Sequence, residues 1–477
     1  MPTTNGNRKI LDLKRWEFCT PSPVNTAAGS FIASSRHYRQ QQLFVQAQTV
    51  AYLYNPNEDG WIQIPSPAYT TAVAAGACGT AACWSTGTTV GASQLTATGG
   101  TTSTIITNQT IARDLRGYSV HITGGPNNGQ TLEILSNTTG ANAVLRVATQ
   151  GSAFTASTTY RLLTPVWYTL NGGTVAAAQW RKYCFATNTW TSLTTTGLPA
   201  SVGTDARLIA TPSWIDTTYK AFGSGTATSG GATTLTDSGK SWTTNQWTNY
   251  QVRIVSGTGA GQIRTISSNT STALTVPTWG TNPDATSVYS IEGNDDFIYL
   301  IGAGAVTLYR YSISGNSWST LSPGAARSGA PSTGMSGHWI WGATDSAWTS
   351  ESAIINGRRI YSFRGGAGAI LDYYDIAANT WTSNITYAPK TETFTTGTKY
   401  VYIGDYLYMQ KDATGRWFRY NIVTSQMDGW NTMLYPNGAA LLGDTAFDVH
   451  YHDGETDIDY IHMLLNTSAV HLRQMVI

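Results

Sequence analysis

The stretch Tyr374-Asp375-Ile376-Ala377-Ala378-Asn379-Thr380-Trp381 carries the clearest local signal in the sequence. Aromatic residues such as those at its two ends are common in strands, and the Ala-Asn pair between them is typical of a tight turn. We therefore expect a β-hairpin here, in which Tyr374 and Trp381 pack on one another.

The same frame recurs along the chain. A Trp follows a Tyr by seven residues at Tyr54 and Trp61, at Tyr183 and Trp190, and at Tyr311 and Trp318; a looser copy extends from Tyr420 to Trp430. Such repetition, with turn residues between the aromatics, indicates a repeated supersecondary unit.

These repeats resemble the kelch family of β-propellers. The family's repeat has a hydrophobic strand, a Tyr-Asp strand, a turn rich in Asn and Gly, and a Trp that opens the outer strand. Hydrophobic strands that match this order precede the Tyr residues at 42–45, 297–302 and 359–363, and Gly365-Gly366 is the clearest copy of the family's double glycine. The resemblance implies an all-β propeller and carries no activity with it.

The two ends of the chain complement each other. Trp16 precedes Pro21 much as Trp61 precedes Pro65, but no Tyr strand comes before Trp16. Two strands that lack a closing Trp are expected at 458–465 and 470–477. Joining the ends would complete one blade and remove the open edges of a ring of sheets. We therefore predict a six-bladed kelch-like β-propeller closed by both termini, its blades marked by Trp16, Trp61, Trp190, Trp318, Trp381 and Trp430.

Two intervals between successive Trp residues, of 129 and 128 residues, are far longer than a propeller repeat of about 40–50 residues. The surplus segments resemble each other: Tyr118, Gln130 and Asn137 in the first have the same spacing as Tyr250, Gln262 and Asn269 in the second. We expect a duplicated all-β module, inserted at 85–164 and again at 223–293, with the propeller formed by 1–84, 165–222 and 294–477.

The second copy, with SGTGAGQIRTISSNTSTALTV at 256–276, resembles a small β-module that recurs in bacteriophage virion proteins. The resemblance implies a non-enzymatic structural component of the virion, in the tail, neck or head surface, that assembles with other virion proteins and as a homo-oligomer. The alternative is a receptor- or glycan-binding protein of the particle that recognises the host surface. Four aromatics would serve either role by stacking on sugars or filling a protein interface, although core packing between blades explains many of them equally well: Trp84, Trp339, Trp341 and Trp348.

Composition limits the partners. Charged residues make up 12% of the chain and the net charge is +1, without a Lys/Arg cluster, so neither nucleic acid nor an anionic membrane is expected as a partner. The first sixteen residues lack the apolar segment of a secretory signal, and no run approaches the length of a membrane span. We expect synthesis in the host cytoplasm before incorporation into the virion.

Three groups of residues are candidates for chemical sites. The stretch from Asp237 to Trp242 fits part of the Asp-box of sialidase-like propellers, in which the box is a structural turn. His450 and His452 alternate on an expected strand; a metal site is conceivable there, but a solvated strand face is the expectation. Solvated turns, rather than a Ca²⁺ site, are also expected for the acidic residues Asp295, Asp296, Asp453, Glu455, Asp457 and Asp459.

The four cysteines, Cys19, Cys78, Cys83 and Cys184, lack the paired spacing of a zinc site. Cys78 and Cys83 lie in what reads as a Gly/Ala-rich loop; a disulfide under oxidising conditions and two unpaired thiols are both open, the second being the plainer interpretation. The sequence also lacks GxSxG, HExxH and P-loop motifs. We expect no enzyme activity, no cofactor and no metal.

Overall fold

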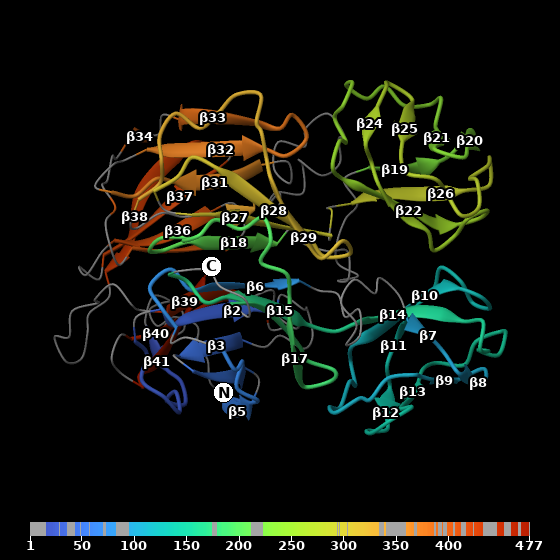
Figure 1. Ribbon diagram of the computed structural model, residues 1–477, viewed down its shortest axis with the longest axis horizontal. Helices are drawn as coiled ribbons and strands as arrows, with labels where there is room; N and C mark the ends of the chain where they lie inside the picture. Colours follow the sequence, from blue (N-terminus) through green and yellow to red (C-terminus); the bar gives the residue numbers. More distant parts are fainter. Residues whose placement is uncertain are drawn as a thin grey trace, which may run out of the picture.

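The computed structural model (Figure 1) consists of β-strands joined by turns and loops, with no helix among the residues that it describes. These are residues 16–476 except for 28, 36–42, 48, 57, 70–72, 83–94, 174–178, 211–222, 293, 295, 303, 333–337, 340–358, 367–369, 386–387, 390–393, 395–397, 404–405, 412–415, 423, 433–445, 453–458 and 466–468. The all-β fold class expected from the sequence is confirmed for this part of the chain.

Six of the described sheets lie outside the two long inserts, and we number them sheet 1 to sheet 6 in chain order. Sheet 1 contains β2 (Phe31–Ser34), β3 (Leu43–Ala47), β4 (Val50–Asn55) and β5 (Gly60–Ile64). Sheet 2 contains β6 (Cys78–Ala82), β15 (Val166–Leu170), β16 (Trp180–Cys184) and β17 (Thr189–Ser192). Sheet 3 contains β18 (Arg207–Ala210), β27 (Phe297–Ile301), β28 (Leu308–Ser312) and β29 (Ser317–Thr320).

The remaining three sheets come from the C-terminal part of the chain. Sheet 4 contains β30 (His338–Trp339), β31 (Arg359–Phe363), β32 (Leu371–Asp375) and β33 (Thr380–Ile385). Sheet 5 contains β35 (Lys399–Ile403), β36 (Tyr406–Lys411), β37 (Arg416–Asn421) and β38 (Gln426–Thr432), with β34 (Ala388–Pro389) parallel to β38. Sheet 6 contains β39 (Ala446–His452), β40 (Asp459–Leu464), β41 (His471–Val476) and β1 (Glu17–Phe18).

Both ends of the chain contribute to sheet 6. Strand β1 pairs antiparallel with β41, with Glu17 opposite Arg473 and Phe18 opposite Leu472. The backbone continues the pairing, because the Cys19 N–H donates to the His471 carbonyl at 3.0 Å. The N-terminal strand therefore covers an edge that β41 would otherwise leave unpaired.

The first strands of successive sheets lie against one another. Strand β2 contacts β39 and β6, β18 contacts β6 and β30, and β35 contacts β39. Large side chains fill the space between sheets: the Phe44 ring stacks on Trp167 with centroids 5.7 Å apart, and the Trp167 indole N–H donates to the Ala33 carbonyl at 3.0 Å. Burial of this aromatic surface holds sheet 1 against sheet 2.

The Gly/Ala-rich segment at Cys78 was expected to be a loop, and this expectation is wrong. Residues Cys78–Ala82 form β6, which pairs along its whole length with β15. A Cβ added at Gly79 would collide with the ring of Phe31 from sheet 1. Small residues are therefore required here by close packing between two sheets, and they do not mark a loop.

The two long inserts fold into separate bodies, visible as the two β-rich lobes on the right of Figure 1. We call the strands at 95–163 module 1 and those at 223–292 module 2. Module 1 contains β7 (Leu95–Thr96), β8 (Gly99–Gly100), β9 (Thr104–Ile106), β10 (Ser119–Gly124), β11 (Thr131–Glu133), β12 (Ser136–Asn137), β13 (Val144–Arg146) and β14 (Thr159–Leu163). Module 2 contains β19 (Gly223–Thr226), β20 (Ser229–Gly231), β21 (Thr234–Thr236), β22 (Gln251–Ser256), β23 (Ile263–Thr265), β24 (Ser268–Asn269), β25 (Ala273–Thr275) and β26 (Val288–Glu292).

The modules share one topology. Module 1 has sheets of order β7-β14-β10-β11 and β8-β9-β13-β12; module 2 has β19-β26-β22-β23 and β20-β21-β25-β24, the same order strand for strand. Even the irregularity agrees, because the register shifts between Ile122 and Gly124 in module 1 and between Ile254 and Ser256 in module 2. Each module lies between the first and second strands of its sheet, sheet 2 for module 1 and sheet 3 for module 2.

Candidate functional site

The Tyr-Trp repeat forms one kind of hairpin in four sheets. Each Tyr lies directly opposite its Trp across two antiparallel strands, in the pairs Tyr54 and Trp61, Tyr183 and Trp190, Tyr311 and Trp318, and Tyr374 and Trp381. The ring centroids of these pairs are 4.9, 5.3, 5.1 and 5.6 Å apart, which is the range of favourable aromatic packing.

The fifth residue after each Tyr explains the turn. Its backbone has a positive φ, which few residue types other than glycine tolerate, and its side-chain oxygen accepts a hydrogen bond from the Tyr hydroxyl. The residues, with φ and hydrogen-bond length, are Asp59 (45°, 2.6 Å), Asn188 (54°, 2.7 Å), Asn316 (43°, 2.6 Å) and Asn379 (50°, 2.8 Å). Asn and Asp serve here because they combine tolerance of this conformation with an acceptor oxygen.

The fifth copy of the frame corrects the sequence interpretation. Met427, not Trp430, lies opposite Tyr420. The turn fixes the register of the two strands. The seventh residue after the Tyr therefore lies opposite the Tyr, whatever its residue type. Trp430 lies further along β38 and its side chain is outside the described residues. Trp16 stands just before β1 and packs on Trp417, with ring centroids 5.3 Å apart.

The same turns link neighbouring sheets. The Trp61 indole N–H donates to the Thr20 carbonyl at 2.9 Å, and that of Trp190 donates to the Pro65 carbonyl at 2.7 Å. In both cases the acceptor lies four residues after the preceding Trp of the repeat, Trp16 or Trp61. The repeat residues therefore form a structural frame, in which the Tyr hydroxyls hold the turns and the indoles of Trp61 and Trp190 also hydrogen-bond to the preceding unit of the repeat.

Module 1 is bound to the frame of sheet 2. The Arg113 guanidinium donates to the Tyr183 hydroxyl at 3.0 Å and to Asn188 Oδ1 at 2.9 Å, and the Ala112 N–H donates to the Ala186 carbonyl at 2.9 Å. These bonds fix the module to a repeat turn.

Module 2 is bound to sheets 3 and 4. The Asn249 side-chain amide donates to the Ile376 carbonyl at 3.1 Å and accepts from the Arg310 guanidinium at 3.2 Å. Arg310 belongs to β28, and Ile376 lies in the repeat turn of sheet 4. Both modules therefore rest on the rim of the repeat sheets.

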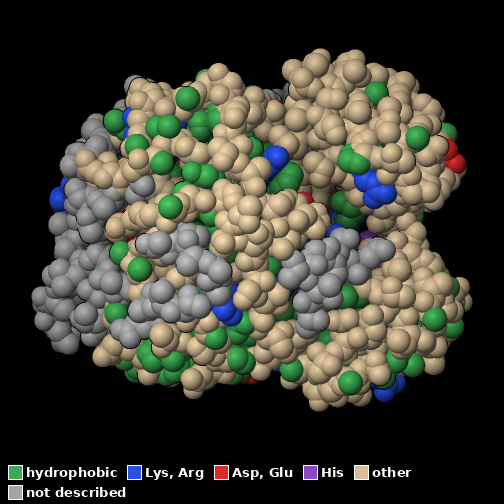
Figure 2. All heavy atoms as spheres, in the orientation of Figure 1, with side chains coloured by type: hydrophobic (Ala, Val, Ile, Leu, Met, Phe, Trp, Pro, Cys, Tyr) green, Lys and Arg blue, Asp and Glu red, His purple; other side chains and the backbone are tan. Residues whose placement is uncertain are grey.

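The modules meet each other through equivalent turns. The Asn128 side-chain amide of module 1 donates to the Ala260 carbonyl of module 2. A Cβ at Gly129 would lie 3.3 Å from the Ala260 methyl, and Gly129 and its equivalent Gly261 both have positive φ, 84° and 88°. Figure 2 shows the modules as two lobes with a notch between them.

A polar layer lies behind this contact. His121 and Arg253 occupy equivalent positions on β10 and β22. Burial, together with the nearby charges of Arg253 and Arg161, lowers the pKa of His121 to about 3, so the imidazole is neutral. Arg253 is buried and forms an ion pair with Glu292. The polar layer thus contains a neutral histidine and Arg161 from module 1, and an arginine from module 2 that is paired within its own module.

The Asp-box-like stretch has a structural role in module 2. The buried Asp237 carboxylate accepts hydrogen bonds from the Gly239 N–H at 3.1 Å and from the Tyr289 hydroxyl at 2.7 Å. Trp242 is buried and packs edge-on to Tyr289. Both carboxylate oxygens are therefore engaged in closing a turn and holding a core tyrosine.

Other candidates lie partly or wholly outside the described residues. Asp296 anchors a turn by accepting from the Ser312 hydroxyl at 2.7 Å and the Ser314 N–H at 2.7 Å. His450, His452 and Asp459 lie on strands whose side chains are not described at these positions, and Trp339 is in the same situation. Outside the described residues altogether are Cys83, Trp84, Asp295, Trp341, Trp348, Asp453, Glu455 and Asp457. Cys78 is buried with a free thiol.

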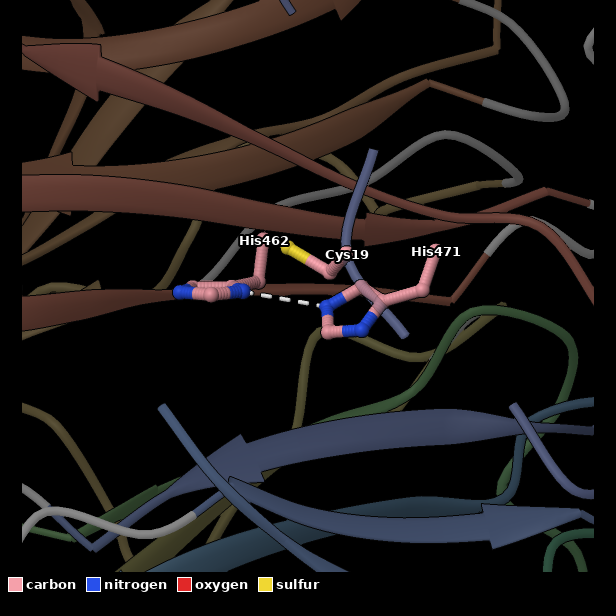
Figure 3. A group of neighbouring side chains, drawn as sticks. All are labelled: Cys19, His462 and His471. Atoms are coloured by element: carbon pink, nitrogen blue, oxygen red, sulfur yellow. Dashed lines mark hydrogen bonds between the residues drawn. The ribbon is translucent and has the colours of Figure 1, made fainter. Parts of the chain in front are cut away.

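One cluster of metal-ligand type was not foreseen from the sequence. Cys19, His462 and His471, all buried, each bring a ligand atom to within 4.8 Å of the others (Figure 3). They come from the segment after β1 and from β40 and β41, all in or beside sheet 6. The only signal for them was the predicted joining of the two chain ends, because all three residues lie in the segments that were expected to meet.

Comparisons with known proteins give no family assignment. No family model matches the sequence, and a search of curated proteins finds no match. No helix with the length and hydropathy of a membrane span occurs in the part of the chain that the structure describes.

Among solved structures, the chain is similar to the six-bladed β-propeller lectin of Aleuria aurantia, a fungal protein whose structure showed fucose recognition. The identity is 8%, the alignment covers 95% of this chain and 94% of the lectin, and the TM-score is 0.38. Glutaminyl cyclase of Myxococcus xanthus gives 10% identity over 45% of this chain and 83% of the cyclase, with a TM-score of 0.25. The protein YjhT gives 12% over 62% and 68%, with a TM-score of 0.28. Values this low carry no argument about function, so the proposals below rest on the contacts already described.

Proposed function

We propose that the protein is a non-enzymatic structural component of a bacteriophage virion, in the tail, neck or head surface, built on a six-bladed kelch-like propeller. Sheets 1 to 6 are its blades, and the sharing of sheet 6 by both chain ends closes the ring. The contacts of β2 with β39 and β6, of β18 with β6 and β30, and of β35 with β39 support this arrangement, because the inner strands of neighbouring propeller blades pack against one another.

The observation that carries the proposal is the fixed pairing of the two modules. They have one topology, enter sheets 2 and 3 at the same point, and are held both to the repeat turns and to each other. A catalyst needs a cleft with reactive groups, whereas a rigid platform that presents two copies of one module is suited to contacts with other subunits. The resemblance of module 2 to modules of phage virion proteins is the reason for proposing that this assembly is a virion.

The surface fits an assembly role. Few charged side chains are visible on the face drawn in Figure 2, and charge depletion is a feature of protein interfaces. The large hydrophobic side chains that the described part of the chain exposes lie on the modules, on edge strands and in the loop between β27 and β28: Phe18, Ile62, Ile106, Leu135, Val255 and Val306. The partners that we propose are other virion proteins and further copies of the same chain.

The proposal is tested on virus particles from the source of the sequence. Antibody against this protein, imaged by electron microscopy, should label a fixed position on the head, neck or tail. Light scattering of the purified chain should give the mass of a homo-oligomer. Unlabelled particles, with the protein present only in the host lysate, would contradict the virion assignment.

Recognition of a host glycan or receptor is the second hypothesis from the sequence. Sugars stack on exposed aromatic rings, and among the described side chains Phe18 is the aromatic that is largely exposed. An array of host glycans probed with the purified chain tests this function directly. Saturable binding to one sugar class, lost on competition with the free sugar, would move the protein to this second class.

A further inference from the structure

We propose that Cys19, His462 and His471 form a binding site for a transition-metal ion, with Zn²⁺ the best match, and that the bound ion joins the two ends of the chain. This inference does not depend on the proposed virion role. It rests on the position, the chemistry and the burial of three side chains that lie together in and beside sheet 6.

The geometry is close to that of a metal centre. His462 Nδ1 and His471 Nε2 are 3.0 Å apart, and Figure 3 shows the Cys19 sulfur beside the two rings. Around a tetrahedral ion with bonds of about 2.0–2.1 Å to nitrogen, two imidazole nitrogens are roughly 3.3 Å apart. Small side-chain rotations would therefore bring these three ligand atoms to coordination distance.

The ligand set indicates the class of ion. One thiolate and two neutral imidazoles are ligands for Zn²⁺ and copper, whereas Ca²⁺ and Mg²⁺ require oxygen ligands. The two ring nitrogens that face each other are His462 Nδ1 and His471 Nε2, and either nitrogen of a neutral imidazole can bind a metal through its lone pair.

Cys19 would bind the ion as its thiolate. Binding forms a metal–sulfur bond and releases the thiol proton to solvent. Tyr54 from sheet 1 lies against the site: its ring is 4.5 Å from that of His471, and its hydroxyl donates to Asp59 at 2.6 Å. Tyr54 thereby packs the ligands from the adjacent sheet, as residues around metal ligands commonly do.

A metal bound at this site would stabilise the pairing of the two chain ends. Strand β1 pairs with β41 at only two positions, Glu17 and Phe18, and Phe18 is 66% exposed. So short a strand is weakly held by its own ladder. An ion coordinated by Cys19 and by residues of β40 and β41 would cross-link chain ends that are more than 440 residues apart, and such long-range links give the largest loss of unfolded-state entropy.

The experiment uses the full chain, first stripped of metal with a chelator and then titrated with Co²⁺ and Zn²⁺. Co²⁺ should produce thiolate-to-metal charge-transfer absorption and tetrahedral d–d bands that saturate at one ion per chain, and Zn²⁺ should displace it. X-ray absorption of the Zn²⁺ form should give one sulfur and two imidazole ligands. The melting temperature should rise by at least about 2 °C with Zn²⁺.

Cys19→Ala should weaken Co²⁺ binding by more than about 100-fold and abolish the charge-transfer band, since even changes around metal ligands cost 10–100-fold. The matched control is Cys184→Ala, which removes another buried cysteine side chain, on β16 of sheet 2, and should leave binding unchanged. If the Cys19 variant does not fold, the absorption data on the unaltered chain decide. Absence of sulfur from the metal shell, or equal binding by both variants, would overturn the proposal. The two histidines would then form only a buried hydrogen bond in the core.

Discussion

Module 1 and module 2 have the same sheets, the same bulge and the same insertion point, but different side chains at several buried positions. What they share is the backbone anchor: Asn137 accepts from the Leu115 N–H at 2.7 Å, and Asn269 accepts from the Trp247 N–H at 2.8 Å. In each module the same Asn also donates to two carbonyls. The duplication has therefore kept the polar bonds that define the turn.

The differences lie in how each module fills its interior. Leu115 in module 1 is replaced by Trp247 in module 2, Thr107 by Asp237, and His121 by Arg253. All six side chains are buried. Backbone geometry is thus retained while the packing and the buried charge change, so the two modules should respond differently to substitution and to pH. The four predictions below test this, with hydrogen exchange read separately in peptides of each module.

The largest effect is expected from Trp247→Ala. Removal of a fully buried indole that packs edge-on to Tyr250 should cost about 3–5 kcal/mol of module 2 stability. Protection from hydrogen exchange should fall in β22–β26 and remain in β10–β14. The matched change Leu115→Ala should show the reverse pattern. Equal loss in both modules from either substitution would mean that they unfold as one unit.

Asp237→Ala should cost up to about 3 kcal/mol, because it leaves the Tyr289 hydroxyl, which is buried, and the Gly239 N–H without an acceptor. Thr107→Ala is the matched change in module 1. It removes hydrogen bonds of 3.2 Å with the backbone of Gln109 and a neutral hydroxyl beside Tyr160, and should cost less than about 1 kcal/mol. Thermal unfolding and hydrogen exchange measure both; equal costs would refute the asymmetry between these positions.

Acid should destabilise module 1 through His121. Its folded-state pKa of about 3 lies below that of an unfolded histidine, so the unfolded module takes up a proton as the pH falls. The stability that His121 contributes to module 1 is fully present above the unfolded-state pKa and is lost as the pH falls toward the folded-state pKa. Between pH 7 and pH 5 the free energy of unfolding should therefore fall by about 2 kcal/mol. Exchange protection, corrected for intrinsic rates, should fall in β10 and not in β22, and His121→Gln should remove this pH dependence.

The smallest effect is expected at the contact between the modules. Asn128→Ala removes the amide that donates to the Ala260 carbonyl at an exposed site, and should cost about 0.5–1 kcal/mol. Exchange should accelerate in both turns, at 127–130 and at 259–262. Gln150→Ala, which removes a hydrogen bond within module 1, is the control and should leave the turn of module 2 unaffected. A change confined to module 1 for Asn128→Ala would mean that the contact does not couple the modules.

The hairpins and the duplication were predictable because their signals are local. A Tyr, an Asn or Asp five residues later and a Trp after seven residues specify strand, turn and register within eight residues, as the pairing of Tyr374 with Trp381 illustrates. Duplication is visible as equal spacing of Tyr, Gln and Asn in two segments. The prediction for Cys78–Ala82 was wrong, because small residues are also typical of loops. In the structure this segment is a strand, and its small residues are required by close packing on Phe31, which is far away in the sequence.

In the fifth repeat, the motif did not predict which residue lies opposite the Tyr. Trp430 was assigned by residue type, whereas the register of β37 and β38 places Met427 opposite Tyr420. A strand register follows the turn geometry, and a tolerated substitution at the paired position hides the repeat from a search for Trp.

By itself, the sequence determined an all-β chain of repeated hairpins with a module copied twice, since side-chain period, turn residues and repeat spacing are properties of short stretches. Only the tertiary structure decided which distant parts meet. It placed Cys19 beside His462 and His471, and the turn at Asn128 against the one at Ala260. Contacts between residues hundreds of positions apart leave no periodic trace, because they follow from how whole sheets pack once their hairpins have formed.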